Sequence, residues 1–296
     1  MYKNMIQYKA NGSDRMILTS PRTIEELNNL LPYSDGFIIG INDYCVNINN
    51  GFSIEQIKQI NKIIKENKKQ IFININKNMN NQDIENIKLI LKELNNLNID
   101  GLLFYDIGIV NLSKKLKLNY DLVWSQEHLT TNYNTCNYWY KQGIKYTFLS
   151  SEITKKEIQE IIKNTKMKLI ITLFGYLPMF TSKRHLVSNY LETFNLKKQG
   201  KYIYKEGKTY PIIDNKLGTT VYSNYILDGL EEYLELKDNY LFLNNFNIDE
   251  ETFLKTIKIY KNLNKKNLIK SKEEMEKLYS NLSKGFLYKN TVYKVK

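Results

Sequence analysis

Short apolar runs and amphipathic segments alternate along the first 173 residues of the chain. A helix is predicted after Ser53, because Ile54, Ile57, Ile60 and Ile64 recur at the spacing that places side chains on one helix face. Apolar runs that are too short for such a helix are predicted to be buried strands. These runs cover residues 15–20, 36–40, 71–76, 101–106, 121–127, 146–150 and 168–173. Regular alternation of strands and helices is typical of parallel strands joined by crossover helices.

Two further helices have a recognisable start. Thr23 with Glu26, and Thr154 with Glu157, stand three residues apart, as in a capping box. In that arrangement the threonine hydroxyl and the glutamate carboxylate each accept a hydrogen bond from a backbone N–H group that would otherwise have no partner. Helices are therefore predicted to begin just after Thr23 and Thr154.

An eighth apolar run, residues 240–245, follows only after a long segment, 176–239. Eight strand–helix units predict an α/β fold, a TIM-like (β/α)8 barrel of regular or irregular form, with 176–239 inserted between strands seven and eight. Residues 201–223 within the insertion have the pattern of a hairpin, with turns at 206–207 and 215–218. No Ser- or Gly-rich linker divides the chain, so we expect 1–296 to form a single domain that contains 176–239 as a subdomain.

Composition narrows the classes of protein that fit. No run approaches the ~18 consecutive apolar residues of a membrane helix, and the first 15 residues lack the apolar core of a signal peptide. Two cysteines, Cys45 and Cys136, cannot build a disulfide framework. These observations favour a protein of the reducing cytoplasm with no membrane contact.

The net charge of +12 is concentrated near the C-terminus, where residues 255–296 contain twelve Lys and three Glu. A cationic face of this kind attracts nucleic acid. Four lysines of the helix predicted after the eighth strand recur at steps of three and four residues, which predicts one exposed stripe that contacts RNA. The four are Lys255, Lys258, Lys261 and Lys265. The alternative is a lysine-rich proteome, because Lys, Asn and Ile are all abundant here.

Polar residues directly follow several predicted strands, where the C-terminal rim of a barrel carries its chemistry. Asn74 and Asn76 are two residues apart, so their side chains point to the same side of the strand. The other rim candidates are Asp106, Ser125, Glu127, Ser150 and Glu152. For each one alone a structural role is the simpler interpretation, but their shared position predicts a pocket.

Searches for common catalytic motifs find none. The sequence contains no HExxH, P-loop or GxSxG pattern. The two histidines, His128 and His185, and the two cysteines do not have the spacing of a zinc site. We therefore expect no metal ligands in this chain.

The segment FGYLPMFTSKRHLVSNY, residues 174–190, places Lys183 and Arg184 beside aromatic residues just after a predicted buried strand. Arginine offers a planar fork to carboxylate or phosphate, and lysine adds a point charge. The segment is either part of a ligand site or an ordinary loop. In the second case Arg184 would pair with Glu152 or Asp106 and brace the barrel mouth.

Three stretches resemble peptidase family U32. They are WSQEHLTTNYNTCNYWYKQGIKYTFLSSEITKKEI (124–158), the segment from Leu173 to Tyr190, and GFLYKNTVY (285–293). The similarity extends over roughly 15–293 and is strongest to the short Bacillus-type branch, which is associated with tRNA 5-hydroxyuridine synthesis. It implies a role in hydroxylation of a tRNA wobble uridine, with prephenate as the source of the hydroxyl group.

In the better-understood branches of this family, cysteines hold an iron–sulfur cluster. The chain has Pro178 and His185 where the family signature has two of these cysteines, and no cysteine follows Cys136. The usual arginine before Glu152 is replaced by Ser151. We therefore expect no cluster in this chain, and a cysteine-bearing U32 paralogue as its partner.

The resemblance and the rim positions together predict a site for substrate or another anionic ligand. Its residues are Ser125, Glu127, Asn132, Glu152, Lys183, Arg184, Asn189 and Tyr190. Two other functions stay open: a peptidase, as in the collagenase-like hydrolases that gave the family its name, and a non-catalytic scaffold that stabilises the paralogue.

Overall fold

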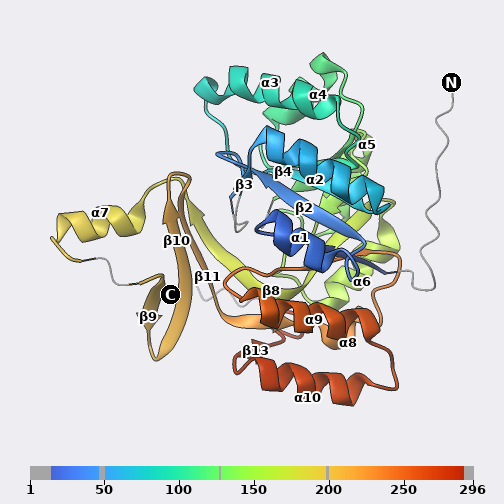
Figure 1. The fold of residues 1–296 in the computed structure, drawn as a ribbon, viewed down its shortest axis with the longest axis vertical. Helices are drawn as coiled ribbons and strands as arrows, with labels where there is room; N and C mark the ends of the chain where they lie inside the picture. The colour runs from blue at the N-terminus through green and yellow to red at the C-terminus, as the bar shows by residue number, and fades with distance from the viewer. Residues whose placement is uncertain (1–14, 47–50, 127, 198–199, 290–296) are drawn as a thin grey trace.

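The computed structural model describes residues 15–46, 51–126, 128–197 and 200–289, and its centre is a closed barrel of eight parallel strands (Figure 1). Strand β12 pairs with β1 on one side and with β8 on the other, which closes the barrel. The predicted TIM-like barrel is confirmed, and each of the eight predicted runs overlaps one barrel strand. The strands are β1 (Met16–Thr19), β2 (Gly36–Ile41), β4 (Gln70–Ile75), β5 (Gly101–Phe104), β6 (Asp121–Ser125), β7 (Tyr146–Phe148), β8 (Lys168–Ser182) and β12 (Tyr240–Leu243). Short strands β3 (Gly51–Phe52) and β13 (Leu282–Ser283) pair with β2 and β11.

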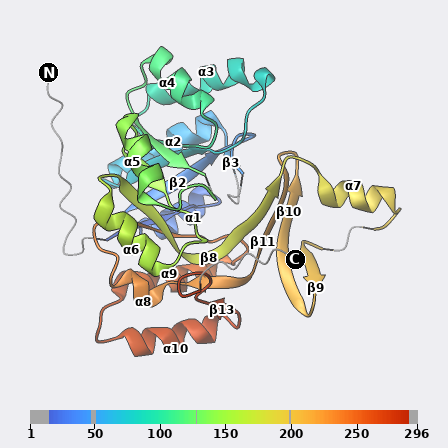
Figure 2. The same ribbon diagram turned by 180° about the vertical axis from the view of Figure 1, so that it is seen from behind.

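Apolar side chains fill the barrel, so it has a packed interior. Phe72 lies at its centre, with the rings of Tyr146 and Tyr240 at 5.9 and 5.7 Å. The outward-facing side chains of the strands pack against a surrounding layer of helices, which Figures 1 and 2 show from opposite sides. These helices are α1 (Ile24–Leu30), α2 (Ile54–Glu66), α3 (Ile84–Asn95), α4 (Gly108–Leu116), α5 (Tyr133–Lys141), α6 (Lys155–Asn164), α8 (Leu230–Tyr233), α9 (Glu250–Asn262) and α10 (Leu268–Leu278). A short 3-10 helix, η1 (Asn81–Asp83), precedes α3. None of the described helices is long and apolar enough to cross a membrane.

The predicted helix starts are confirmed. Ser53 and Thr154 each form a complete capping box at the start of α2 and α6. Thr23 accepts a hydrogen bond from the backbone N–H of Glu26, but Glu26 does not complete a box. Its carboxylate turns inward to the side chain and backbone of Arg22 instead.

Glu26 joins the first and last parts of the barrel. Its side chain is 1% exposed, and its Oε1 atom accepts hydrogen bonds from Arg22 Nη2 at 2.7 Å and Asn245 Nδ2 at 2.9 Å. Its Oε2 atom accepts from the backbone N and the Nε atom of Arg22, at 2.6 and 3.0 Å. Arg22 Nη1 also donates to the carbonyl oxygen of Ile248, at 2.6 Å. Arg22 follows β1 and Asn245 follows β12, so this buried carboxylate connects the loops on both sides of the closing strand pair.

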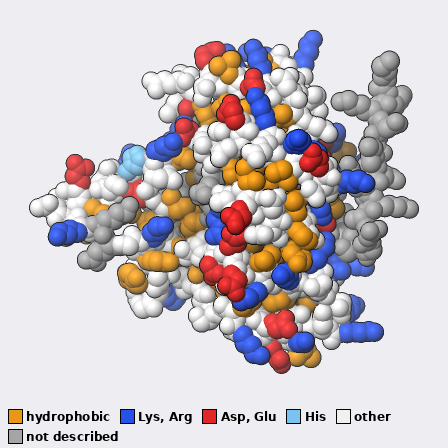
Figure 3. Space-filling view, in the orientation of Figure 1, with side chains coloured by type: hydrophobic (Ala, Val, Ile, Leu, Met, Phe, Trp, Pro, Cys, Tyr) orange, Lys and Arg blue, Asp and Glu red, His pale blue; other side chains and the backbone are white. Residues whose placement is uncertain are grey.

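A projecting arm, defined here as residues 176–226, extends from one side of the barrel (Figures 1 to 3). Strand β8 does not end where the barrel ends but continues to Ser182, where it pairs with antiparallel β11 (Gly218–Asp228). Strands β10 (Lys208–Asn215) and β9 (Tyr202–Lys205) extend the sheet, and α7 (Leu186–Thr193) lies at the outer end of the arm. The hairpin predicted within 201–223, with both of its turns, is confirmed.

Gly175 marks the point where β8 leaves the barrel. Its φ angle is +111°, and a Cβ atom there would lie 2.3 Å from the carbonyl oxygen of Asn244. Both facts require glycine, since the angle is unfavourable for other residues and the approach of the two chains leaves no room for a side chain.

Candidate functional site

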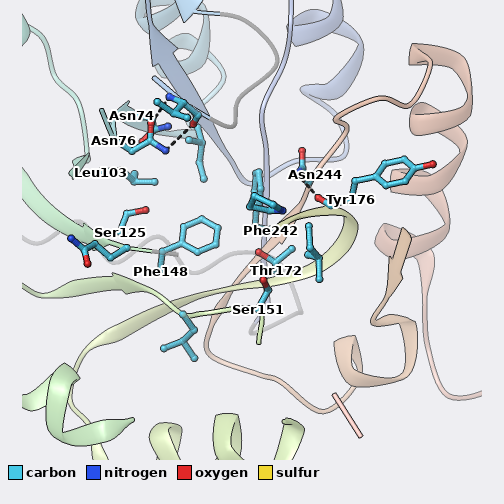
Figure 4. A pocket seen from close by; sticks show the side chains of 16 residues that line it. Asn74, Asn76, Leu103, Ser125, Phe148, Ser151, Thr172, Tyr176, Phe242 and Asn244 are labelled. Atoms are coloured by element: carbon cyan, nitrogen blue, oxygen red, sulfur yellow. Dashed lines mark hydrogen bonds between the residues drawn. The ribbon is translucent and has the colours of Figure 1, made fainter. Parts of the chain in front are cut away.

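A pocket opens at the C-terminal mouth of the barrel, where the rim residues were expected to gather (Figure 4). Its apolar wall includes the rings of Phe148 and Phe242, which meet edge to face at 5.5 Å. The cavity measures about 90 Å³, and none of the described residues that line it is charged. Its polar lining consists of amides and hydroxyls: Asn74, Asn76, Ser125, Gln126, Ser151, Thr172, Tyr176 and Asn244.

Among the described polar residues that line this pocket, Asn74 has a buried side-chain atom without a hydrogen-bond partner. Its side chain is 2% exposed, and its Oδ1 atom has no partner. Asn76 lines the same pocket, as the two-residue spacing predicted, but both ends of its amide bond the backbone of Val46, at 2.6 and 2.8 Å. Buried polar atoms are rarely left without a partner because desolvation without a hydrogen bond is costly. The Oδ1 atom of Asn74 is therefore an acceptor without a donor at the wall of the pocket.

A wider cleft of about 500 Å³ lies outside the pocket and shares Asn76, Ser125 and Gln126 with it. The side chains that line this cleft include the cationic Lys77, Lys183 and Lys216. The site therefore has two parts, an uncharged inner pocket and an outer cleft with cationic groups.

The three lysines differ in the partners they have. Lys77 pairs with Asp83 at 2.8 Å, and Lys216 pairs with Asp43. Partial burial favours protonation of Asp83, but hydrogen bonds from the Asn80 backbone and from Lys77 outweigh it and lower the pKa of the carboxyl group. Lys183 instead donates to a neutral acceptor, the Oδ1 atom of Asn80, at 3.1 Å. Among the described cations of the cleft, Lys183 is thus well placed to meet an anionic group.

The structure places the predicted ligand residues in separate regions. Ser125 lines both the pocket and the cleft, and Lys183 lines the cleft. The Oε2 atom of Glu152 lies 3.5 Å from the Nδ1 atom of His128, and His128 lines the cleft. Asn132 is exposed and caps α5, where its Oδ1 atom accepts from the Thr135 N–H at 3.0 Å. Glu127 lies outside the described residues.

The other three predicted ligand residues lie on the arm beyond Lys183. Asn189 and Tyr190 lie on α7, and the exposed Tyr190 ring contacts Phe194 at 4.8 Å. Arg184 is exposed, and the described residues include no ion pair between it and Glu152 or Asp106. The carboxylate of Asp106 instead accepts from two backbone N–H groups. The alternative in which Arg184 braces the barrel mouth is therefore wrong, while a role for these residues in ligand binding stays a prediction.

The predicted stripe of four lysines does not form as expected. Helix α9 ends at Asn262, so Lys265 lies beyond it, and Lys261 is half-buried and pairs with Asp35 at 3.0 Å. Lys255 pairs with Glu251 at 2.7 Å. Lys255 and Lys258 line a groove between α9 and α10 together with Lys270 and Lys277. The end of α9 and the tertiary ion pair of Lys261 thus separate the four lysines, and their contact with RNA stays a prediction.

The donor groups present do not fit the iron–sulfur cluster that the family resemblance implies. Burial raises the pKa of the Cys45 thiol to about 12 and that of Cys136 to about 11, so neither is a ready thiolate ligand. Pro178, at a signature cysteine position, lines the inner pocket. Within the described part of the chain, no group of three or more His, Cys, Asp or Glu side chains could hold a metal ion.

The pocket residues that the sequence analysis missed include Phe148, Thr172, Phe242 and Asn244. Asn244 had the same signal as Asn74, since it is a polar residue that directly follows an apolar strand run. Thr172 and the two phenylalanines lie within such runs, where sequence alone does not separate the barrel interior from its outer face.

The closed barrel with a pocket at its C-terminal mouth defines a TIM-barrel protein of the kind that binds ligands at this end. A model of peptidase family U32 matches residues 23–294, and the chain belongs to this family. It is 24% identical to tRNA hydroxylation protein P2 of Bacillus subtilis (strain 168) over 309 residues, which covers 94% of this chain and 98% of that protein. It is also 22% identical to tRNA hydroxylation protein P1 of the same organism, over 59% of this chain and 42% of that protein. A solved structure of the U32 peptidase Mk0906 has the same fold, with a TM-score of 0.52 and 12% identity, over 80% of this chain and 95% of that one.

Proposed function

We propose that this protein acts in the hydroxylation of the wobble uridine of tRNA and that its barrel mouth receives one nucleotide. The observation that carries the proposal is the division of the site into an uncharged, amide-lined pocket and an outer cleft with cationic groups. A nucleotide is divided in the same way, into an uncharged base and an anionic phosphate. The similarity to two proteins named for tRNA hydroxylation supports RNA as the source of that nucleotide.

In the proposed complex the base leaves its stack and enters the inner pocket. Enzymes that act on a base read the extruded ring through hydrogen bonds to its edge and contacts with its faces. The Asn74 amide offers the hydrogen bond, and Phe148 and Phe242 offer apolar contact. A cavity of about 90 Å³ is far smaller than the ~300 Å³ or more of pockets that hold drug-sized ligands, which favours a single pyrimidine ring. Lys183 would hold the phosphate outside.

We assign the redox chemistry to a second protein. The two buried cysteines of this chain do not make a cluster site, so we propose a cysteine-bearing U32 paralogue as partner, with prephenate as the hydroxyl source. The described lining of the inner pocket offers no cation to the carboxylates of prephenate. Prephenate would therefore bind in the outer cleft or on the paralogue.

Among the described residues we find no specific contact that favours peptidase activity. Ser125 and His128 both line the outer cleft, but in the described structure no hydrogen bond joins them. A serine nucleophile is activated by such a bond to its base. Incubation of the pure protein with collagen-like and unstructured peptides tests this alternative, and specific cleavage that is lost in Ser125→Ala would establish it.

The proposed function is tested by nucleoside mass spectrometry of tRNA from a deletion strain. We expect 5-hydroxyuridine to disappear and to return with the wild-type gene. It should stay absent with Asn74→Leu, which keeps the size of the side chain but removes the amide, and return with Asn28→Leu, an exposed control on α1. Unchanged 5-hydroxyuridine in the deletion strain would refute the proposal. Full rescue by Asn74→Leu at normal protein level would show that the chain acts as a scaffold and does not receive the base.

A further inference from the structure

The arm carries an unusual share of the exposed apolar surface. Of the sixteen large apolar side chains that are exposed in the described structure, nine belong to residues 176–226. Five of the nine are aromatic: Phe180, Tyr190, Phe194, Tyr202 and Tyr204. Exposed apolar groups scattered singly are normal, but a cluster of them on one projecting element marks a binding surface.

The elements of the arm that carry these rings are covered on few sides. Helix α7 has no buried residue, and the paired rings of Tyr190 and Phe194 on it are 57% and 59% exposed. All four residues of β9 are exposed, and in the described sheet β9 pairs with β10 alone, so one edge is open; the Tyr202 hydroxyl donates to Asn247 Oδ1 at 3.3 Å. A two-stranded ribbon with both faces in water is only marginally stable by itself. A partner that covers α7 and β9 would stabilise both.

The charge of the arm indicates the kind of partner. Residues 176–226 contain eight Lys and Arg against three Asp and Glu, a net charge of +5 over about a sixth of the chain. Lys201 and Lys205 flank the aromatic residues of β9, and Figure 3 shows cationic and hydrophobic side chains close together on the arm. Lysines pair with phosphates, and exposed rings stack on unpaired bases, so the combination is typical of surfaces that bind single-stranded nucleic acid.

We infer that the arm binds unpaired nucleotides of an RNA, through base stacking on Tyr190, Phe194 and Tyr204 and phosphate contacts of the neighbouring lysines. The identification of that RNA as tRNA rests on the proposed function; the stacking surface itself does not. The outer end of the arm is therefore a second RNA contact, distinct from the nucleotide pocket at the barrel mouth, to which the base of the arm contributes Tyr176, Leu177 and Pro178.

Fluorescence anisotropy with the full-length protein tests this inference. The probes are a labelled single-stranded oligouridylate, an RNA duplex of equal length and a whole tRNA. Tyr190→Ala should weaken binding of the single strand about tenfold, in line with the loss of one stacked base. Tyr138 is the matched control, because this tyrosine on α5 is also 57% exposed, and Tyr138→Ala should leave the affinity unchanged. Tyr190→Phe should bind like the wild type, because the ring is kept.

Salt dependence separates the two kinds of contact. Tyr190→Ala should leave the slope of log affinity against log salt unchanged, since no charge is lost. Lys205→Gln should reduce that slope by about 0.7, the value for one phosphate contact of a single strand. The duplex should bind more weakly than the single strand, because its bases cannot stack on the arm.

Three results would overturn the inference: no binding of the oligouridylate by the wild-type protein, equal affinities of Tyr190→Ala and Tyr138→Ala, or an effect of Tyr190→Ala on association with a second protein while RNA affinity is unchanged. The last result would show that the arm docks a protein. These outcomes are independent of the deletion-strain experiment, since 5-hydroxyuridine can depend on the protein while the arm binds no RNA, and the arm can bind RNA while 5-hydroxyuridine is unaffected.

Discussion

Replacement of Glu26 by glutamine should strongly destabilise the barrel, although the residue lies in the first turn of the outer helix α1. The carboxylate is 1% exposed and accepts four hydrogen bonds, three from Arg22 and one from Asn245. A glutamine amide has one oxygen, so the other end of the side chain would present N–H groups to two donors. Glu26→Gln therefore breaks two of the four bonds and removes the carboxylate charge that faces Arg22.

The size of the effect follows from these contacts. Each lost bond to a charged group costs ~1.5–3 kcal/mol, and removal of one partner of a buried ion pair costs ~3–5 kcal/mol. The Arg22 side chain is 23% exposed and can recover contact with water, which places the cost at the low end, about 3 kcal/mol. This value corresponds to a change of more than a hundredfold in the unfolding equilibrium.

Urea unfolding followed by circular dichroism measures this cost as a shift of the midpoint at constant slope. Glu25→Gln is the matched control, because Glu25 is the exposed neighbour in the same helical turn, and it should change the free energy of unfolding by about 0.5 kcal/mol or less. If the free energies of unfolding of Glu26→Gln and Glu25→Gln differed by less than about 0.5 kcal/mol, the argument that Glu26 stabilises the contact between the loops after β1 and β12 would be refuted.

Three other predictions concern backbone, thiols and metal. Gly175→Ala should lower the free energy of unfolding by at least ~2 kcal/mol, because the new Cβ atom would clash with the Asn244 backbone. Gly143 is the control: its φ angle is +88° but no atom lies within 4 Å of the new Cβ, so Gly143→Ala should cost only ~1 kcal/mol. Equal costs would contradict the steric argument. Cys45 and Cys136 should not react with a thiol reagent in the native protein at about pH 8, because burial raises their pKa to about 12 and about 11, and both should react in denaturant. Rapid native labelling would contradict this. Protein purified without oxygen should contain no stoichiometric iron or sulfide, and a brown protein with a cluster absorption band would refute that expectation.

The barrel could be predicted because its signals are local. Each strand is an apolar run bounded by polar residues, and capping residues such as Ser53 and Thr154 mark helix starts without reference to the rest of the chain. The closing pair between β12 and β1 follows from the count of eight units, although the two strands are separated by most of the sequence.

The site was harder to predict because neighbours in sequence separate in space. Lys183 faces the cleft at the barrel mouth, while Asn189 and Tyr190, a few residues later, lie on α7 of the arm. The segment 174–190 was interpreted either as part of a ligand site or as an ordinary loop, yet its first part, 174–182, continues β8 by pairing with a strand some forty residues away. The partner of Lys261 is likewise hidden from sequence spacing, because its ion pair with Asp35 joins residues that are far apart in the chain.

The continuity of β8 has a mechanical consequence. The same strand belongs to the barrel up to Phe174 and lines the pocket with Tyr176, Leu177 and Pro178 at the base of the arm. It then continues as a strand of the arm. No linker lies between these parts of β8, so the base of the arm has no loop about which it can swing. An RNA that is held on the arm would therefore present its nucleotides at a set distance from the barrel mouth. The arm would thus fix the distance between the RNA segment that it binds and the target nucleotide, so that a target is selected by this distance as well as by its base.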